Sequence, residues 1–333
     1  MPARGGGRAL TGSTIGNHLS PLSIPTIHTM QQRSIGSLRV SVVGLGCNNF
    51  GWRLDAAKTK VVVDAALDAG ITHFDTADLY GEGQSEALLG KALGTRRTNV
   101  VVATKFGHER SAFGSGARPE HIRRALDGSL KRLGSDYVDL YYLHQPDPHT
   151  PIADTLGALN DAVQAGKVRD IACSNFSVEQ LQEAQRAVRP GAARFAAVQN
   201  EFSLVHRDPE QGVLAECERQ GIAFVPYFPL ASGLLSGKYR KGQPVPQGRL
   251  SEGRYADNLS DEKLDLVERL IAFAEGKGHT VLDLAFAWLL AHGTVASVIA
   301  GATKVEQARA NAGASAWELS SSEMAAVAEL LRG

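Results

Sequence analysis

Residues 100–144 read VVVATKFGHERSAFGSGARPEHIRRALDGSLKRLGSDYVDLYYLH. The β-branched and apolar run Val100–Thr104 predicts a buried strand, and the run Tyr137–Leu143 predicts a second one. Between them, Pro119–Leu133 carries apolar residues at helical spacing with proline in the first turn, which predicts an amphipathic helix. A strand, a helix and a strand in this order form the repeating unit of a parallel sheet covered by helices.

The same alternation continues on both sides of this stretch. Six more strands are predicted, at Val40–Gly44, Ile71–Phe74, Val168–Ala172, Ala196–Gln199, Ile222–Tyr227 and Ser297–Ala300. Eight such units in about 280 residues are typical of a TIM barrel, so we expect an α/β fold, a (β/α)8 barrel that forms a single domain over residues 33–333. A doubly wound sheet would have fewer strands and a complete glycine fingerprint, whereas Gly44, Gly46 and Asn49 give only part of one.

Three segments fall outside the repeat. Ala231–Ser260 is too long for an ordinary connection after the seventh strand, so we expect a lid or a loop that covers a cofactor. Ser321–Arg332 predicts an additional C-terminal helix on the barrel exterior or near its mouth. Residues 1–32 have a glycine triplet and no periodic apolar pattern, which predicts a disordered arm. Because Met30 could be the initiator, the sequence leaves open whether the mature protein keeps this arm, and a transit peptide is the less favoured interpretation.

Four helix starts have the residue pattern of a capping box. In each, a serine or threonine can exchange hydrogen bonds with the side chain and backbone of the residue three positions later. The four pairs are Ser177 with Gln180, Thr280 with Asp283, Thr303 with Glu306, and Ser320 with Glu323.

The composition argues against several classes of function. The 333 residues include 35 basic and 35 acidic side chains, so no net charge would attract nucleic acid or an anionic membrane. Three cysteines without metal-ligand spacing predict neither a disulfide framework nor a metal site. The most apolar stretch, Val281–Ala291, is too short to span a bilayer. We expect a soluble, cytoplasmic protein whose oligomeric state the sequence does not fix, with a monomer as the default.

In a barrel of this kind, reactive groups lie at the carboxyl ends of the strands. The second, third and fourth predicted strands end at Asp75, Lys105 and His144, and Tyr80 follows in the loop after the second strand. Neighbouring strands lie about 4.8 Å apart, so these four side chains can converge on one small volume. Taken singly, each has an ordinary explanation as a helix cap, a rim lysine or a packed ring, but their shared location favours catalysis.

This set of side chains suits proton donation to a carbonyl group. A phenol is a poor acid at neutral pH, but an adjacent ammonium lowers its pKa, so we interpret Tyr80 as the general acid and Lys105 as the group that tunes it. Asp75 would hold Lys105 charged, and neutral His144 would donate a hydrogen bond to the carbonyl oxygen. Hydride delivery to the carbonyl carbon would complete the reduction of an aldehyde or ketone. A Schiff base on Lys105 is a weaker alternative, because Asp75 should keep that amine protonated.

The later strands end in residues that could hold the hydride donor. Asn175 and Gln199 offer amide groups that can pair with a carboxamide, and the ring of Tyr227 could stack on a nicotinamide. Gly301–Lys304 opens a helix, and the first N–H groups of a helix favour a phosphate, as does the charge of Lys304. Ordinary capping and core packing remain the alternative explanation for this half of the rim.

Four motifs, in their order and spacing, resemble the aldo-keto reductase superfamily from about Gln32 to Arg332. They are FDTADLYG at 74–81, TKFG at 104–107, DLYYLH at 139–144 and SNF at 174–176. The resemblance implies a catalytic tetrad with a tyrosine as general acid, made of Asp75, Tyr80, Lys105 and His144. It also implies that NADP is held at its carboxamide by Ser174, Asn175 and Gln199 and stacks on Tyr227.

The resemblance extends to the rest of the cofactor. Residues 229–238 look like the family's loop over the pyrophosphate, with Leu230 and Lys238 as contacts. A later segment looks like the site for adenine and the adenosine 2′-phosphate, and the residues implied there are Gly301, Thr303, Lys304, Gln307 and Asn311. Lys304 favours NADP(H), but Ala300 replaces a common proline and basic residues are fewer than in strongly NADP-selective members, so NAD(H) stays open. The pattern is nearer the bacterial reductases and the potassium-channel β subunits than the mammalian aldose reductases.

Three functions are compatible with these residues. The first is an NADPH-dependent reductase of aldehydes or ketones, because all four catalytic residue types are present. The second is an NAD(P)-dependent dehydrogenase of a sugar or small alcohol, because the same chemistry is reversible. The third is a regulatory subunit that binds NADPH and senses redox state. The sequence fixes neither the physiological substrate nor the direction of the reaction.

Overall fold

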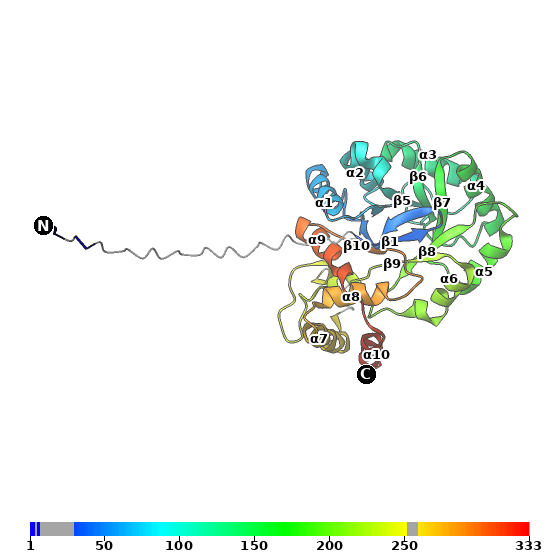
Figure 1. The fold of residues 1–333 in the computed structure, drawn as a ribbon. Coiled ribbons are helices and arrows are strands. Elements are labelled where there is room, and N and C mark those ends of the chain that lie inside the picture. The colour runs from blue at the N-terminus through cyan, green and yellow to red at the C-terminus, as the bar shows by residue number, and fades with distance from the viewer. Residues whose placement is uncertain (4, 7–29, 252–258, 333) are drawn as a thin grey trace.

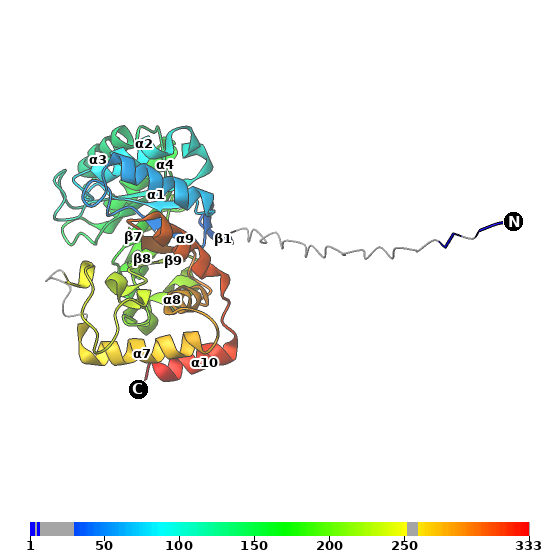
Figure 2. The ribbon, with the colours of Figure 1, turned by 90° about the vertical axis from the view of Figure 1, so that its left-hand side faces the viewer.

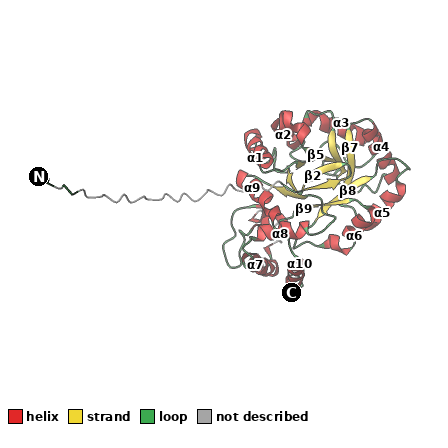
Figure 3. Ribbon diagram, in the orientation of Figure 1, coloured by secondary structure: helices red, strands yellow, loops and turns green. Residues whose placement is uncertain are grey.

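The computed structural model describes residues 1–3, 5–6, 30–251 and 259–332. Within them, eight parallel strands close into a barrel that helices surround (Figures 1 and 3). The strands are β3 (Val43–Gly46), β4 (His73–Asp75), β5 (Val101–Phe106), β6 (Val138–Leu143), β7 (Val168–Ser174), β8 (Phe195–Glu201), β9 (Ala223–Tyr227) and β10 (Val298–Gly301). Because β10 pairs with both β9 and β3, the sheet closes and has no edge strand. The predicted (β/α)8 TIM barrel is confirmed.

Ten α-helices are found among the described residues, most of them outside the barrel wall (Figure 3). They are α1 (Ala56–Asp68), α2 (Gln84–Leu93), α3 (Pro119–Leu133), α4 (Ile152–Gln164), α5 (Val178–Ala187), α6 (Val213–Gln220), α7 (Asp261–Glu275), α8 (Val281–Leu290), α9 (Val305–Gly313) and α10 (Ser321–Leu330). Short 3₁₀ helices form part of the connections, including η3 (Ala231–Ser236) and η4 (Arg249–Ser251) in the long connection after β9.

Three of the four predicted capping boxes are confirmed, those at Ser177, Thr280 and Ser320. The fourth, at Thr303, is wrong. Helix α9 begins at Val305, and Lys304 occupies its N-cap position without a side-chain cap. The Thr303 hydroxyl and backbone N–H donate to the Gln307 side chain instead, so Thr303 closes the turn that precedes the helix.

An antiparallel hairpin of β1 (Gln32–Ile35) and β2 (Leu38–Ser41) precedes the barrel. Its buried side chains form one apolar cluster with residues of the barrel interior, so it closes the end where the strands begin. Arg33 fastens it by donating to the backbone oxygens of Leu290 and Val295, at 2.8 and 2.5 Å. The predicted first strand, Val40–Gly44, is therefore wrong in its bounds, since its first half belongs to this hairpin. Of the predicted disordered arm, residues 1–32, residues 4 and 7–29 lie outside the described residues, and Gln32 already belongs to β1.

Alternation along β5 separates two hydrophobic layers and places a lysine in the barrel interior. Val101 and Ala103 belong to the interior cluster, whereas Val102 and Phe106 pack in the layer between the barrel and its helices. Successive side chains of a strand point to opposite faces, so Lys105 continues the inward row. The Lys105 ammonium group therefore lies inside the barrel at the carboxyl ends of the strands, which we call the upper end.

The C-terminal helix packs outside the barrel, as predicted. Helices α7 and α10 lie side by side (Figure 2), and Arg269 of α7 donates to the backbone oxygen of Leu330 in α10 at 3.3 Å. Among the described residues, no helix is long and apolar enough to cross a membrane.

Close packing of α2 on α3 generates a testable prediction about stability. A Cβ atom added at Gly90 would lie 2.0 Å from the backbone oxygen of Leu133, so Gly90→Ala should force the helices apart and lower the free energy of unfolding by about 1–3 kcal/mol. Gly157 lies inside α4 with open space around it, so Gly157→Ala is the matched control and should raise that free energy by up to about 1 kcal/mol. Chemical denaturation measures both, and a Gly90→Ala variant as stable as Gly157→Ala would contradict the packing argument.

Candidate active site

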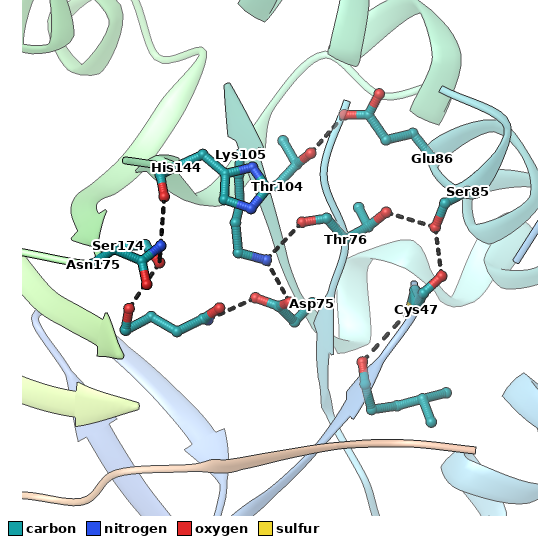
Figure 4. A network of polar contacts seen from close by, with 12 residues as sticks. Cys47, Asp75, Thr76, Ser85, Glu86, Thr104, Lys105, His144, Ser174 and Asn175 are labelled. Carbon is teal, nitrogen blue, oxygen red and sulfur yellow. Dashed lines mark hydrogen bonds and ion pairs between the residues drawn. The ribbon is translucent and has the colours of Figure 1, made fainter. Parts of the chain in front are cut away.

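The four residues proposed as a catalytic set lie together at the upper end of the barrel. Asp75 ends β4 and Lys105 lies near the end of β5, with side chains that are almost completely buried, at 2% and 1% exposure. The Lys105 ammonium donates to Asp75 at 2.5 Å and to the backbone oxygen of Thr76 at 3.0 Å (Figure 4). The second oxygen of Asp75 accepts from the side chain of Gln199 at 2.9 Å. Both buried charges are therefore paired and hydrogen-bonded, which burial requires.

The environment of Lys105 keeps its amine charged. Burial alone would lower the pKa of Lys105, but Asp75 and Tyr80 act in the opposite direction through charge and hydrogen bonding, and the pKa is raised. A protonated amine is not a nucleophile, so this arrangement disfavours a Schiff base on Lys105.

Tyr80 approaches the Lys105 amine from the loop after β4. The amine lies 5.2 Å from the centroid of the Tyr80 ring, within the range of a cation–π contact. Burial raises the pKa of Tyr80, and the charge and hydrogen bonding of Lys105 lower it without reversing the direction. The expected net lowering is therefore wrong for this state of the protein, because desolvation of the phenol outweighs the neighbouring ammonium. The phenol keeps its proton at neutral pH. If that proton leaves, the Lys105 ammonium can stabilise the phenolate.

His144 follows β6 and is held at the same place as a neutral ring. Its backbone N–H donates to the Phe106 oxygen at 2.9 Å, and its ring contacts the Tyr80 ring edge to face, with centroids 6.0 Å apart. Burial lowers the pKa of His144 well below its usual value, and the charges of Lys105 and Arg110 lower it further. A neutral imidazole beside a phenol can donate a hydrogen bond to a carbonyl oxygen.

Hydrogen bonds connect this set to the residues predicted to hold a cofactor carboxamide. Asn175 donates to the His144 backbone oxygen at 3.0 Å and accepts from the Tyr227 hydroxyl at 2.8 Å. Ser174 donates to the Gln199 backbone oxygen at 2.7 Å, and the Gln199 amide is the one that binds Asp75. Figure 4 shows Ser174 and Asn175 on the His144 side of the lysine. The sequence does not predict this direct link between Gln199 and the ion pair.

The other predicted cofactor residues lie further along the rim. Strand β10 pairs with β9 through Ile299 and Tyr227, so the segment that follows β10 begins beside the tyrosine. Gly301 ends β10, and the segment after it holds Thr303, Lys304, Gln307 and Asn311. Leu230 and Lys238 flank η3 in the long connection. Lys304 is exposed at the start of α9, whereas the Gln307 side chain is engaged by Thr303. Part of the predicted covering loop, residues 252–258, lies outside the described residues.

A second buried cluster, which the sequence analysis missed, lies between the barrel wall and helices α2 and α3. Glu86 accepts from the Thr104 hydroxyl at 2.5 Å and from Arg132 at 2.6 Å. Asp78 is fully buried. The Ser111 side chain and the Leu79 backbone lie near its carboxyl group and favour the charged form, but neither donates to it in hydrogen-bonding geometry. Its backbone N–H donates to the Lys105 backbone oxygen at 3.1 Å. The signal in the sequence was an acidic pair on either side of Tyr80, within a motif that already had another explanation.

The buried carboxyl group of Asp78 predicts a measurable pH dependence. Burial, together with the charge of Glu86, raises the pKa of Asp78 from 3.8 to about 6. The folded protein therefore binds this proton more tightly than the unfolded chain, so this contribution to stability is complete below about pH 4 and is lost as the pH rises through 6. Between pH 4 and pH 7, the free energy of unfolding should fall by about 3 kcal/mol more in the wild type than in Asp78→Asn.

Denaturant titrations of both proteins across this range measure the difference. Equal slopes of stability against pH for the wild type and Asp78→Asn would mean that Asp78 does not carry the proton.

Comparison with known proteins identifies relatives over nearly the whole chain. Residues 42–332 match the model of the aldo/keto reductase family. An aldo-keto reductase of Schizosaccharomyces pombe, whose name specifies NADP(+), is 36% identical over 324 residues, which cover 92% of each chain. A probable voltage-gated potassium channel subunit beta of Oryza sativa subsp. japonica is 36% identical over 291 residues, covering 84% of this chain and 89% of the relative.

A solved structure agrees with these matches. Glycerol dehydrogenase from Gluconobacter oxydans has a TM-score of 0.78 and 29% sequence identity, with 92% of this chain and 95% of that chain covered. The resemblance that the four motifs indicated is therefore confirmed.

Proposed function

Because the chain belongs to the aldo/keto reductase family, and is thus an NAD(P)H-dependent oxidoreductase, we propose that it reduces aldehydes or ketones to alcohols with NADPH and with Tyr80 as the general acid. One observation carries the proposal. The Lys105 ammonium is buried against Asp75 and lies 5.2 Å from the centroid of the Tyr80 ring, so a phenolate formed there would have a fixed cation beside it.

The residues divide the work on the substrate between them. His144 and Tyr80 would both donate hydrogen bonds to the carbonyl oxygen, which orients the carbonyl and polarises it. During reduction the Oη–H bond of Tyr80 breaks and its proton passes to the carbonyl oxygen. The electron pair of that bond stays on Oη, where Lys105 stabilises the negative charge. Asp75 is a positioning residue, because it acts by holding the ammonium.

The residues at the rim fit a nicotinamide cofactor. Tyr227 is a partly exposed ring beside the amide of Asn175, which suits a flat ring that bears a carboxamide. Helix α9 starts without a side-chain cap, so its first N–H groups remain available to a phosphate. When bound, such a cofactor supplies the hydride. Ser174 and Gln199 would hold the carboxamide together with Asn175.

The preference for NADPH rests on the far end of the site. Leu230 and Lys238 would contact the pyrophosphate, and Gly301, Thr303, Gln307 and Asn311 would surround the adenosine. Lys304 is an exposed cation at the start of α9, where the helix dipole adds to its attraction for an anion, so a 2′-phosphate has a partner there. The relative from Schizosaccharomyces pombe, named for NADP(+), supports this choice, and NAD(H) is the alternative.

Oxidation of a sugar or small alcohol is the second candidate function. The similar solved structure is named a glycerol dehydrogenase, and the proton transfer from Tyr80 is reversible, so the same site could oxidise an alcohol. A regulatory role that senses NADPH is the third, since one relative is named as a channel subunit. We place the protein in the cytoplasm because its three cysteines are free and buried, and we expect no nucleic-acid partner.

Replacement of Tyr80 tests the proposed general acid. Tyr80→Phe removes only the transferable proton, so kcat for carbonyl reduction should fall by at least about 100-fold while the Kd for NADPH stays within about twofold. Oxidation of NADPH at 340 nm with a panel of aldehydes and ketones measures the first quantity, and quenching of protein fluorescence measures the second. Tyr137→Phe is the matched control, because Tyr137 precedes β6 at the opposite end of the barrel and should leave turnover unchanged.

Two outcomes would count against this scheme. A Tyr80→Phe variant that keeps more than a tenth of the wild-type kcat would assign the proton to another group. Tight NADPH binding by the wild type without turnover of any carbonyl or alcohol would favour the sensing role.

Replacement of Lys304 tests the choice of cofactor. Lys304→Met removes the cation at the start of α9, so KM for NADPH should rise by about tenfold while KM for NADH changes by less than about twofold. Lys277→Met is the control for loss of an exposed lysine, because Lys277 follows α7 and pairs with Glu323 of α10. Equal effects of Lys304→Met on the two cofactors would show that this lysine does not read the 2′-phosphate.

A further inference from the structure

A sharp turn fixes the residue that follows the lysine strand. Gly107 adopts a left-handed backbone conformation with φ of +86°, and a Cβ atom there would lie 2.8 Å from the backbone oxygen of Gly116. The Gly116 N–H donates to the Gly107 oxygen at 3.0 Å and closes the loop. His108, the next residue, is therefore held at the rim by backbone geometry rather than carried on a free loop.

The ring of His108 lies against the proposed catalytic set. It contacts the His144 ring edge to face, with centroids 5.0 Å apart and an angle of 73° between the ring planes. The ring of His144 also contacts that of Tyr80, so three rings line one side of the site in contact. The proposed proton transfer does not use His108, although its ring is nearer to His144 than the Tyr80 ring is.

Hydrogen bonding determines which ring nitrogen of His108 is available as a donor. The Arg110 backbone N–H donates to Nδ1 of His108 at 3.1 Å, so Nδ1 is the acceptor and the neutral ring carries its hydrogen on Nε2. Burial and the charge of Arg110 lower the pKa of His108, against a smaller effect of Glu109, which keeps the ring neutral at pH 7. In the part of the chain that the structure describes, no group accepts from this Nε2–H.

We propose that His108 is a specificity-determining residue that donates from Nε2 to a hydroxyl group on the carbon next to the substrate carbonyl. The preferred substrates are then α-hydroxy aldehydes and α-hydroxy ketones. This inference rests on the proposed function, because it assumes that the carbonyl oxygen is bound by His144 and Tyr80.

The chemistry of two adjacent donors favours this class of substrate. His108 presents a neutral N–H donor on a ring in contact with that of His144, which we propose donates to the carbonyl oxygen. An α-hydroxy carbonyl presents two oxygen atoms on neighbouring carbons. A neutral donor pairs well with a hydroxyl, whereas a phosphate or carboxylate favours a charged partner. A substrate bound over the partly exposed His108 ring would exclude water from it, so an analogue that lacks the hydroxyl would leave this N–H donor unpaired.

Paired substrates and variants test the proposal. The substrates are 2-hydroxypropanal and propanal, which differ only in the α-hydroxyl group. The wild type should show a higher kcat/KM for 2-hydroxypropanal. His108→Leu should lower that value by about tenfold and change the value for propanal by less than about twofold. His108→Gln, which offers an N–H donor at similar reach, should restore part of the loss. Glu109→Gln, an exposed neighbour, is the control for changes to the loop.

The outcomes separate this inference from the function on which it rests. Equal losses of kcat/KM with both substrates in His108→Leu would overturn the inference and leave reduction by Tyr80 intact. The same follows if the wild type does not distinguish the two substrates. Absence of turnover with every carbonyl, despite NADPH binding, would instead overturn the proposed function and this inference with it.

Discussion

The burial of one positive charge inside a closed barrel constrains the rest of the site. The Lys105 ammonium is almost completely removed from water, and an unpaired buried charge would cost several kcal/mol. Asp75 neutralises it, the Thr76 backbone oxygen accepts a second hydrogen bond, and Gln199 satisfies the remaining oxygen of Asp75. Strands β4, β5 and β8 must therefore end at fixed positions along the barrel axis. The continuous hydrogen-bonded sheet keeps them in that register.

This constraint also couples the two halves of the rim. Gln199 both supports Asp75 and bonds through its backbone to Ser174, while Asn175 joins the His144 backbone to the Tyr227 hydroxyl. A chain of direct contacts thus runs from the ion pair to the residues that we propose hold the cofactor. A cofactor carboxamide bound to these residues would compete for hydrogen bonds that the protein now makes with itself. Cofactor binding would therefore change the hydrogen bonding of Asp75.

The sequence predicts much of this arrangement because barrel strands and site residues share one pattern. β-Branched runs locate all eight strands to within a few residues, and the carboxyl-end rule then brings Asp75, Lys105 and His144 together. The predictions fail for features that depend on contacts between distant parts of the chain. Strand β2 continues almost directly into β3, so their boundary depends on which partner each one finds. The bond between Gln199 and Asp75 spans 124 positions, and the pKa of Tyr80 depends on how completely the fold removes water.

The hairpin of β1 and β2 closes one end of the barrel and leaves the other end open. Its apolar side chains fill the end of the barrel where the strands begin, and Arg33 anchors it to backbone oxygens at the end of α8 and just after it. Solvent and reagents can therefore reach Lys105 only from the end of the barrel where the strands finish. An amine-directed reagent aimed at this lysine would have to pass His144 and Tyr80, so occupancy of the mouth by a ligand should shield the amine from labelling.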